Sequence, residues 1–114
     1  MRDLLMVVAS TATRRRGGDK VFRNKMWYSY VLRSKKNGRF YYGSTSDLKR
    51  RFLEHNQGIG GKYTRDNRPF ELVYYEAYLN NKDAKKAEDF YKSGYGREVF
   101  KGKIENFLKD CPVV

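Results

Sequence analysis

Nearly all of the aromatic residues in this 114-residue chain lie after residue 25. Phe22 is the one exception among ten tyrosines, seven phenylalanines and a tryptophan. Because large aromatic side chains supply much of the surface that a small domain can bury, the core must be built from residues 26 onward. The length accommodates one such core, since two would each fall near the lower size limit for independent folding. We therefore predict a single folded domain over residues 26–109, with a short tail at 110–114.

The first 25 residues carry charge rather than core-forming side chains. They include seven lysines and arginines but only two acids. Their apolar run at residues 4–9 is short for a signal peptide, whose hydrophobic region needs about 7–15 residues. We predict that residues 1–25 form a disordered basic leader, or that the true start of the protein is Met26.

The overall charge indicates a polyanionic partner. With 25 basic and 13 acidic residues, the chain has a formal net charge of +12 at neutral pH. No apolar run reaches the roughly 18–20 residues that cross a bilayer, so we expect no membrane partner. One cysteine, Cys111, excludes an internal disulfide, and one histidine, His55, excludes a histidine-rich metal centre. We expect a cytoplasmic protein, in which Cys111 remains a reduced thiol.

Strand and helix signals alternate after residue 25. Segments rich in β-branched and aromatic residues predict strands at 27–32, 39–43 and 70–79. Asn37-Gly38, between the first two, is a strong hairpin signal. Helix-forming residues with apolar positions three or four apart predict helices at 48–57, 82–92 and 97–109, with a loop at 58–69. The predicted order of elements is ββαβαα.

Tyrosines of the predicted hairpin are the first candidates for chemistry. Tyr28 and Tyr30 are two residues apart and so project from one face of the first strand. Tyr41 lies on the partner strand, which allows these phenols to converge on one patch. Aromatic cross-strand pairs also stabilise hairpins without any catalytic role, by about 0.2–1 kcal/mol. The tyrosines alone therefore leave both interpretations open.

The predicted helix at 48–57 is basic. Arg51 and His55 are four residues apart and share one helix face, although Asp47 could instead pair with Arg51 at the same spacing. The helix and the loop after it supply four further expected nucleic-acid contacts, which are Lys49, Arg50, Lys62 and Arg65. A basic helix face by itself indicates phosphate binding and not catalysis.

Glu88 is the most informative acid of the chain. It lies at the margin of a small apolar face on the predicted helix 82–92, where a carboxylate is either an ordinary amphipathic edge residue or a functional group near the core. One carboxylate is enough to hold Mg²⁺, which keeps several waters and takes only one or two protein carboxylates beside a substrate phosphate.

The chain resembles the GIY-YIG endonuclease superfamily over about residues 26–109, and the similarity rests on Tyr28-Ser29-Tyr30, Tyr41-Tyr42-Gly43, Arg51, His55-Asn56 and Glu88. More narrowly, it is similar to small stand-alone bacterial members related to the N-terminal incision domain of the DNA-repair nuclease UvrC. The resemblance implies an α+β fold in which a three-stranded antiparallel sheet is flanked by three helices. It also implies metal-dependent hydrolysis of phosphodiester bonds in DNA.

Carried over residue by residue, the resemblance implies catalytic roles for Tyr30, Tyr41, Arg51 and His55, and a metal-binding role for Glu88. Glu88 would hold one Mg²⁺ or Mn²⁺ that polarises the scissile phosphate. Arg51 would stabilise charge on the phosphate oxygens. Tyr30 would be the general base, its phenolate favoured by the metal and by Arg51. His55 would relay a proton or position Tyr41, and we expect all five side chains to share one groove.

The chain departs from the family pattern at several positions. The first motif reads Tyr-Ser-Tyr in place of Gly-Ile-Tyr, and the second reads Tyr-Tyr-Gly in place of Tyr-Ile-Gly. Ser44 stands where the repair branch has a lysine, so that branch's extra phosphate contact is absent. Since no DNA-reading domain of the homing-enzyme kind is attached, selectivity would come from a protein partner or from the shape of the substrate. We expect a monomer.

Two other functions stay open at the level of sequence. A non-catalytic nucleic-acid-binding module could keep the same fold, and the basic, aromatic composition also permits RNA as the partner. Every one of these functions predicts binding that weakens with salt, because lysine and arginine contacts release counterions. Only turnover distinguishes a nuclease from a binding module.

Overall fold

The computed structural model describes residues 25–111. Its strands are β1 (Trp27–Ser34), β2 (Phe40–Thr45) and β3 (Phe70–Tyr78). Its helices are α3 (Leu48–Gln57), α4 (Lys62–Asn67), α5 (Asn81–Lys92), α6 (Gly94–Lys103) and α7 (Glu105–Asp110). None of these helices is both long and apolar enough to span a membrane. Residues 1–24 of the predicted leader and 112–114 of the predicted tail lie outside the described range.

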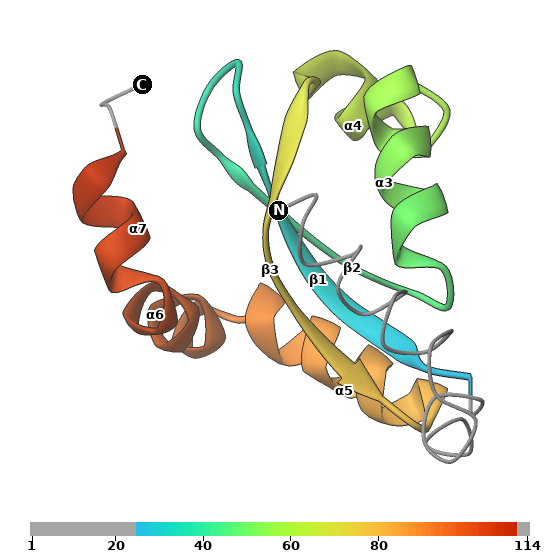
Figure 1. Cartoon of the computed structure of the whole chain (residues 1–114). Coiled ribbons are helices and arrows are strands. Elements are labelled where there is room, and N and C mark those ends of the chain that lie inside the picture. Colours follow the sequence, from blue (N-terminus) through green and yellow to red (C-terminus); the bar gives the residue numbers. More distant parts are fainter. Residues whose placement is uncertain (1–24, 112–114) are drawn as a thin grey trace, which may run out of the picture.

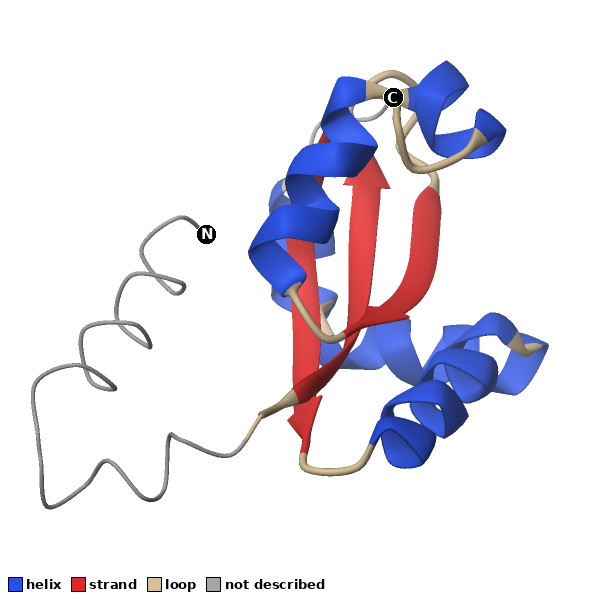
Figure 2. Cartoon of the chain, turned by 90° about the vertical axis from the view of Figure 1, so that its right-hand side faces the viewer, coloured by secondary structure: helices blue, strands red, loops and turns tan. Residues whose placement is uncertain are grey.

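The three strands form one antiparallel sheet in the order β2-β1-β3, so that β1 is central and β2 and β3 are the two edge strands. The hairpin turns at Gly38, whose φ of 78° is readily adopted only by a residue without a Cβ. Helices α3 and α4 cover one face of the sheet and α5, α6 and α7 cover the other (Figure 1), while the strands lie side by side in Figure 2. The α+β fold class is therefore confirmed.

Each face of the sheet has its own hydrophobic core. The core under α3 consists of Tyr30, Leu32, Leu48, Phe70 and Leu72. The core on the opposite face consists of Val31, Tyr42, Tyr91, Phe100 and Ile104. Successive residues of β1 alternate between the two cores because side chains of a strand point to opposite faces. A single layer of backbone therefore separates two distinct environments.

Local signals account for the boundaries of α3. The Asp47 side chain accepts a hydrogen bond from the backbone N–H of Arg50 at 3.1 Å and so caps the first turn. Gly58 ends the helix in the left-handed conformation, with φ 84°. Both ends agree with the prediction, and they fix the face that α3 presents to β1 and β2.

The predicted order ββαβαα is confirmed, and the structure adds two details. The segment 58–69, predicted as a loop, contains α4, a six-residue helix that is too short to be stable alone and is held by burial of Thr64. The helix predicted at 97–109 begins at Gly94 and is divided at Ile104, whose φ of −115° and ψ of 29° are not helical. This break turns the chain so that α7 packs Phe107 and Leu108 against the second core.

Candidate functional site

Tyr30 lies at the centre of the candidate site. It is on β1, 2% exposed, and pairs across the sheet with Gly43 of β2. The phenol ring crosses over that glycine, because a Cβ added to Gly43 would lie 2.4 Å from the Tyr30 hydroxyl. Only a residue without a side chain lets Tyr30 reach across β2 toward the edge of the sheet. The glycine of the second tyrosine motif therefore has a steric function.

His55 of α3 holds the Tyr30 hydroxyl. Its Nε2 lies 2.9 Å from the phenol oxygen, in hydrogen-bond contact. The imidazole is completely buried; this burial, and secondarily the charge of Arg51, lower the pKa of His55 to about 4. His55 is therefore neutral at pH 7. Within residues 25–111 its Nδ1 has no hydrogen-bond partner, and Gly60 packs so closely that an added Cβ would lie 2.3 Å from it.

Arg51 lies one helical turn before His55 and is anchored from two sides. It donates from Nη1 to Glu54 at 3.1 Å and from Nη2 to the carbonyl oxygen of Gly60 at 3.3 Å. The ion pair with Asp47 that the sequence allowed is not formed, because Asp47 caps the helix and Arg51 pairs with Glu54 instead. The guanidinium is thus fixed beside the buried pair of Tyr30 and His55.

The electrostatic balance at Tyr30 favours the neutral phenol. Burial is the largest cause that raises its pKa, and the neighbouring Tyr41 and Glu88 raise the pKa further. Arg51 acts in the opposite direction but does not overcome burial. Tyr41 itself packs edge-on against His55, with ring centroids 5.1 Å apart. Arg51 alone therefore does not produce the phenolate that was expected from the sequence.

Glu88 reaches the same stretch of β2 from the opposite face. Ser44, the residue after Gly43, donates from its hydroxyl to Oε1 of Glu88 at 2.7 Å. The ammonium groups of Lys92 and Lys85 lie 2.6 Å from Oε2 and 3.4 Å from Oε1. Burial raises the pKa of Glu88, but hydrogen bonds from Lys92 and Ser44 outweigh it, so that the pKa is lowered. Glu88 is a buried, ionised carboxylate.

The structure thus brings four of the five predicted residues together and places the fifth across the strand edge. Tyr30, Tyr41, Arg51 and His55 lie on the α3 side, and Glu88 lies on the α5 side. Only the backbone of β2 at Gly43-Ser44 separates them. The charge of Glu88 still raises the pKa of Tyr30, so the two groups interact electrostatically. The five side chains are thus divided between the two faces of the edge strand β2, and a single groove that holds all of them stays a prediction.

A divalent ion would find one protein carboxylate at this edge. Among residues 25–111, no three His, Cys, Asp or Glu side chains are grouped closely enough to hold a metal. Mg²⁺ does not require such a group, since it keeps most of its waters and binds substrate oxygens. The ionised Glu88 and the hydroxyl of Ser44 are hard oxygen donors, so they fit a water-rich site of this kind.

The basic residues predicted to contact nucleic acid lie on α3 and α4, and most of them are paired. Arg50 lies 4.0 Å and 3.9 Å from two carboxylates of its own helix region. Lys62 and Arg65 share Asp66, at 2.7 Å and 3.6 Å. Lys49 is exposed and has no ion pair in the described part of the chain. The positive charge on this side is therefore largely compensated by neighbouring acids.

The partners of Glu88 and the close packing of Gly60 against His55 were not predicted from the sequence. Lys85 and Lys92 lie three residues before and four residues after Glu88, a spacing that predicts ion pairs on a helix, so this signal was present. The contacts of Ser44 with Glu88 and of Gly60 with His55 depend on how the elements pack. No local pattern carries that information.

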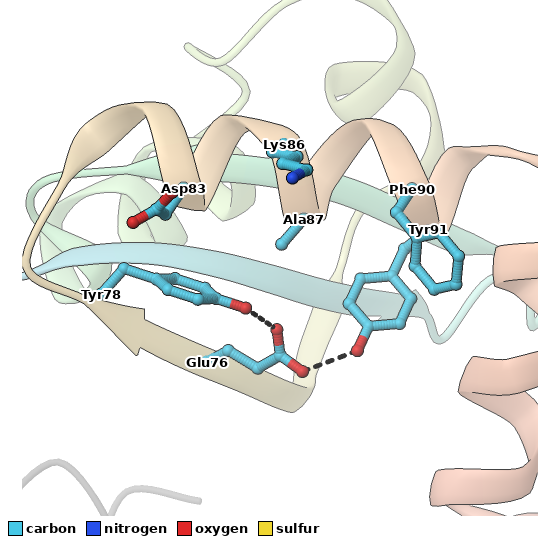
Figure 3. A pocket seen from close by; sticks show the side chains of 7 residues that line it. All are labelled: Glu76, Tyr78, Asp83, Lys86, Ala87, Phe90 and Tyr91. Atoms are coloured by element: carbon cyan, nitrogen blue, oxygen red, sulfur yellow. Dashed lines mark hydrogen bonds between the residues drawn. The ribbon is translucent and has the colours of Figure 1, made fainter.

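A second polar cluster ties β3 to α5. Glu76 accepts hydrogen bonds from Tyr74 and Tyr78 of its own strand and from Tyr91 of α5 at 2.6 Å. Figure 3 shows its carboxylate between Tyr78 and Tyr91, beside a hollow of about 430 Å³. The three phenols lower the pKa of Glu76 against the effect of burial, which raises it. Each of these hydroxyl donors is bonded to Glu76, so we interpret the cluster as a structural contact that stabilises the packing of α5 on β3.

Comparison with known proteins identifies the family of this chain and several relatives. Residues 26–103 match the family model described as the GIY-YIG catalytic domain. A UPF0213 protein from Bacillus pumilus is 42% identical over 66 residues, which are 58% of this chain and 66% of that protein. A UPF0213 protein from Pediococcus acidilactici is 43% identical over 90 residues, which are 77% of this chain and 86% of that protein. The solution NMR structure of a UPF0213 protein from Bacillus halodurans is 35% identical, covers 68% of this chain and 83% of that one, and has a TM-score of 0.43. The present chain belongs to the GIY-YIG catalytic domain family.

Proposed function

We propose that this protein is a metal-dependent endonuclease that hydrolyses phosphodiester bonds in DNA. The observation that carries the proposal is the 2.9 Å contact between the hydroxyl of Tyr30 and a buried, neutral His55, beside the fixed guanidinium of Arg51. A base, a cation and a carboxylate around one strand edge are the groups that phosphate hydrolysis needs. Membership of the GIY-YIG family supports this class of reaction.

The hydrogen bond between Tyr30 and His55 has a preferred direction. Nδ1 of His55 is buried without a partner among the described residues, and an unpaired buried N–H is less well tolerated than an unpaired lone pair. Nε2 therefore carries the proton and donates to the oxygen of Tyr30. In this state His55 stabilises the phenolate form of Tyr30. After the Tyr30 proton has passed to solvent, that phenolate takes a proton from the water whose oxygen attacks phosphorus. The bond from phosphorus to the leaving oxygen breaks, and the leaving oxygen takes its proton from solvent.

Arg51 and Glu88 supply the electrostatic part of the mechanism. The guanidinium of Arg51 donates to the non-bridging oxygens, where negative charge develops. A divalent ion held by Glu88 would polarise the scissile phosphate and stabilise the leaving oxygen. Positive charge close to Tyr30 also opposes the burial that raises its pKa.

A non-cleaving nucleic-acid-binding module is the second candidate. The observation that favours it is the double ion pair of Glu88 with Lys85 and Lys92, which gives the carboxylate a role that needs no metal. Binding by either candidate weakens with salt, so that affinity measurements alone do not separate them.

The substitution Glu88→Gln tests the proposal. The variant keeps the shape of the side chain but loses the charge that attracts a metal. We expect the wild type to cut plasmid, single-stranded or branched DNA with Mg²⁺ or Mn²⁺, and the variant to cut at least about 100-fold more slowly while DNA binding persists. Glu98→Gln, on the exposed side of α6, is the matched control.

Two results would contradict the proposal in different ways. Equal cutting by the wild type and by Glu88→Gln would remove Glu88 from the mechanism. Absence of cutting by the wild type on every DNA with either metal, together with salt-dependent binding, would favour the binding module.

A further inference from the structure

A basic hollow lies beside Glu88, on the α5 side of the sheet. It has a volume of about 570 Å³ and lies where β2 meets the junction of α5 and α6. Its floor is aromatic and its walls are cationic, and it is lined by Arg39, Phe40, Tyr42, Lys92, Arg97 and Lys101. Four of these residues are basic and none is acidic. We refer to this set as the basic hollow.

Two of the four cations of the basic hollow, Arg39 and Arg97, have no acidic partner within residues 25–111, whereas Lys92 pairs with Glu88 and Lys101 with Glu98. Arg97 donates from Nε and Nη2 to the backbone carbonyl of Lys92, at 3.1 Å and 2.8 Å, which fixes the guanidinium without neutralising it. The ammonium of Lys101 lies 3.7 Å from Glu98 in an exposed pair, which contributes little binding energy. Arg39 has no ion pair within residues 25–111. This differs from α4, where both cations share one aspartate.

The basic hollow is continuous with the proposed reaction site. Lys92 lines the hollow and also lies 2.6 Å from Glu88. Tyr42 in the floor and Ser44, which binds Glu88, alternate on β2 and so point to the same face about 7 Å apart, at about 3.4 Å per residue. A DNA strand with one phosphate at Glu88 therefore reaches the hollow within a few nucleotides, whose rise in B-form DNA is about 3.4 Å.

The floor of the hollow does not offer a surface for stacking bases. Phe40 and Tyr42 pack edge-on against Phe100 of the core, with centroid distances of 5.4 Å and 5.8 Å. Stacking of bases requires an accessible ring face, and Tyr42 is only 9% exposed. The guanidinium and ammonium groups of the hollow instead suit phosphate oxygens, which carry no sequence information.

We propose that the basic hollow binds backbone phosphates of the same DNA strand that reaches Glu88, a few nucleotides from the scissile bond. This inference rests on the proposed function because it takes a nucleic-acid strand as the substrate. The hollow orients that strand across the free edge of β2 and adds affinity without adding sequence preference. The substrate therefore extends over the α5–α6 side of the molecule and not only over the basic helix α3.

The double substitution Arg39→Ala/Lys101→Ala tests this site without touching Glu88 or the hydrogen bonds of Arg97. Binding of labelled single-stranded DNA is measured by fluorescence anisotropy without metal, over about 50–200 mM salt. We expect the affinity to fall about tenfold and the slope of log affinity against log salt to decrease in magnitude by about 1.4, or about 0.7 per lost contact. Lys82→Ala/Lys109→Ala removes the same charge from exposed positions of α5 and α7 as a control.

The control pair decides the outcome, because loss of net charge alone would weaken both double variants equally. Equal affinity and equal salt slope in the two double variants would overturn the basic hollow as a binding site. Thermal unfolding of both variants checks that each is folded. The measurement contains no cleavage step, so failure of the two proposals is distinguishable: a protein that never cuts DNA but loses affinity in the hollow variant contradicts the nuclease proposal and supports phosphate binding at the hollow.

Discussion

His55 is the residue on which the proposed chemistry depends most. Full burial and the neighbouring charge of Arg51 disfavour the imidazolium form and lower the pKa of His55 to about 4, so the ring is neutral at pH 7. A neutral ring can orient the Tyr30 hydroxyl, whereas a charged one would repel Arg51. Gly60 completes the arrangement because any larger residue would displace the ring.

Tyr30→Phe tests this pair directly. The substitution removes the hydroxyl and leaves Nε2 of His55 buried without a partner, which costs about 1–3 kcal/mol in the free energy of unfolding. If Tyr30 is the general base, the cleavage rate falls by about 100-fold or more. Chemical denaturation and plasmid-nicking rates measure the two effects separately.

Tyr28→Phe is the control for Tyr30→Phe. Tyr28 lies two residues earlier on the same strand face and packs edge-on against Tyr75 at 5.7 Å, with no hydrogen bond to His55. We expect that loss of the Tyr28 hydroxyl leaves the free energy of unfolding and the cleavage rate close to those of the wild type. Unchanged cleavage in Tyr30→Phe would show that the base is another group.

The structural elements were predictable from sequence wherever their signals are local. The hairpin at Asn37-Gly38 and the two ends of α3 result from turn and capping chemistry, and both agree with the structure. Helix α4 was missed because its six residues come after closely spaced glycines and become helical through packing of Thr64. The break at Ile104 was missed because an apolar stripe has the same spacing in one helix as in two successive helices.

The candidate site was predictable to a different degree on the two faces of the sheet. The motif residues of β1, β2 and α3 converge because hairpin pairing and helix periodicity bring them together. The position of Glu88 depends on α5 lying on the opposite face, which places its carboxylate on Ser44. Neither propensity nor periodicity specifies the face on which a helix packs.

Gly43→Ala tests the close approach of β1 and β2. The added methyl group would lie 2.4 Å from the hydroxyl of Tyr30, so the ring must leave its present position beside His55 or the two strands must separate. We expect a loss of about 1–3 kcal/mol in the free energy of unfolding and a loss of cleavage.

Gly102→Ala in α6 is the control for Gly43→Ala. Nothing lies within 4 Å of its added methyl group, and alanine stabilises a helix by up to about 1 kcal/mol relative to glycine. Stability equal to wild type in Gly43→Ala would show that Tyr30 does not need the glycine.

In the molecule as a whole, the central sheet separates two groups of helices whose surroundings differ chemically. The α3 side holds the buried Tyr30 and His55, and the α5 side holds the charged Glu88 with the basic hollow. Glu76 of β3 links the strand to α5 through its hydrogen bond from Tyr91 (Figure 3). The residues of the candidate site approach one another at the edge strand β2, so a polyanion bound at this edge would contact both sides.

The stability of the whole molecule should depend on pH through His55. Its pKa is about 4 in the folded protein and about 6.5 in the unfolded chain. Between these values the unfolded state binds more protons, so lowering the pH favours unfolding. The stabilisation is fully present above pH 6.5 and is lost as the pH falls toward 4, by an amount on the order of 3 kcal/mol.

His55→Gln isolates this contribution, because glutamine does not titrate and still carries an N–H donor. Urea unfolding of the wild type and of the variant is measured at pH values from 7 down to 4. Carboxylates with lowered pKa values, such as Glu76 and Glu88, lose their stabilisation as the pH falls through their own folded values, and both proteins share that loss. The difference between the two curves should therefore narrow from pH 6.5 to pH 4. Parallel curves would mean that folded His55 accepts a proton normally, which is incompatible with the buried neutral imidazole on which the proposed role of Tyr30 is based.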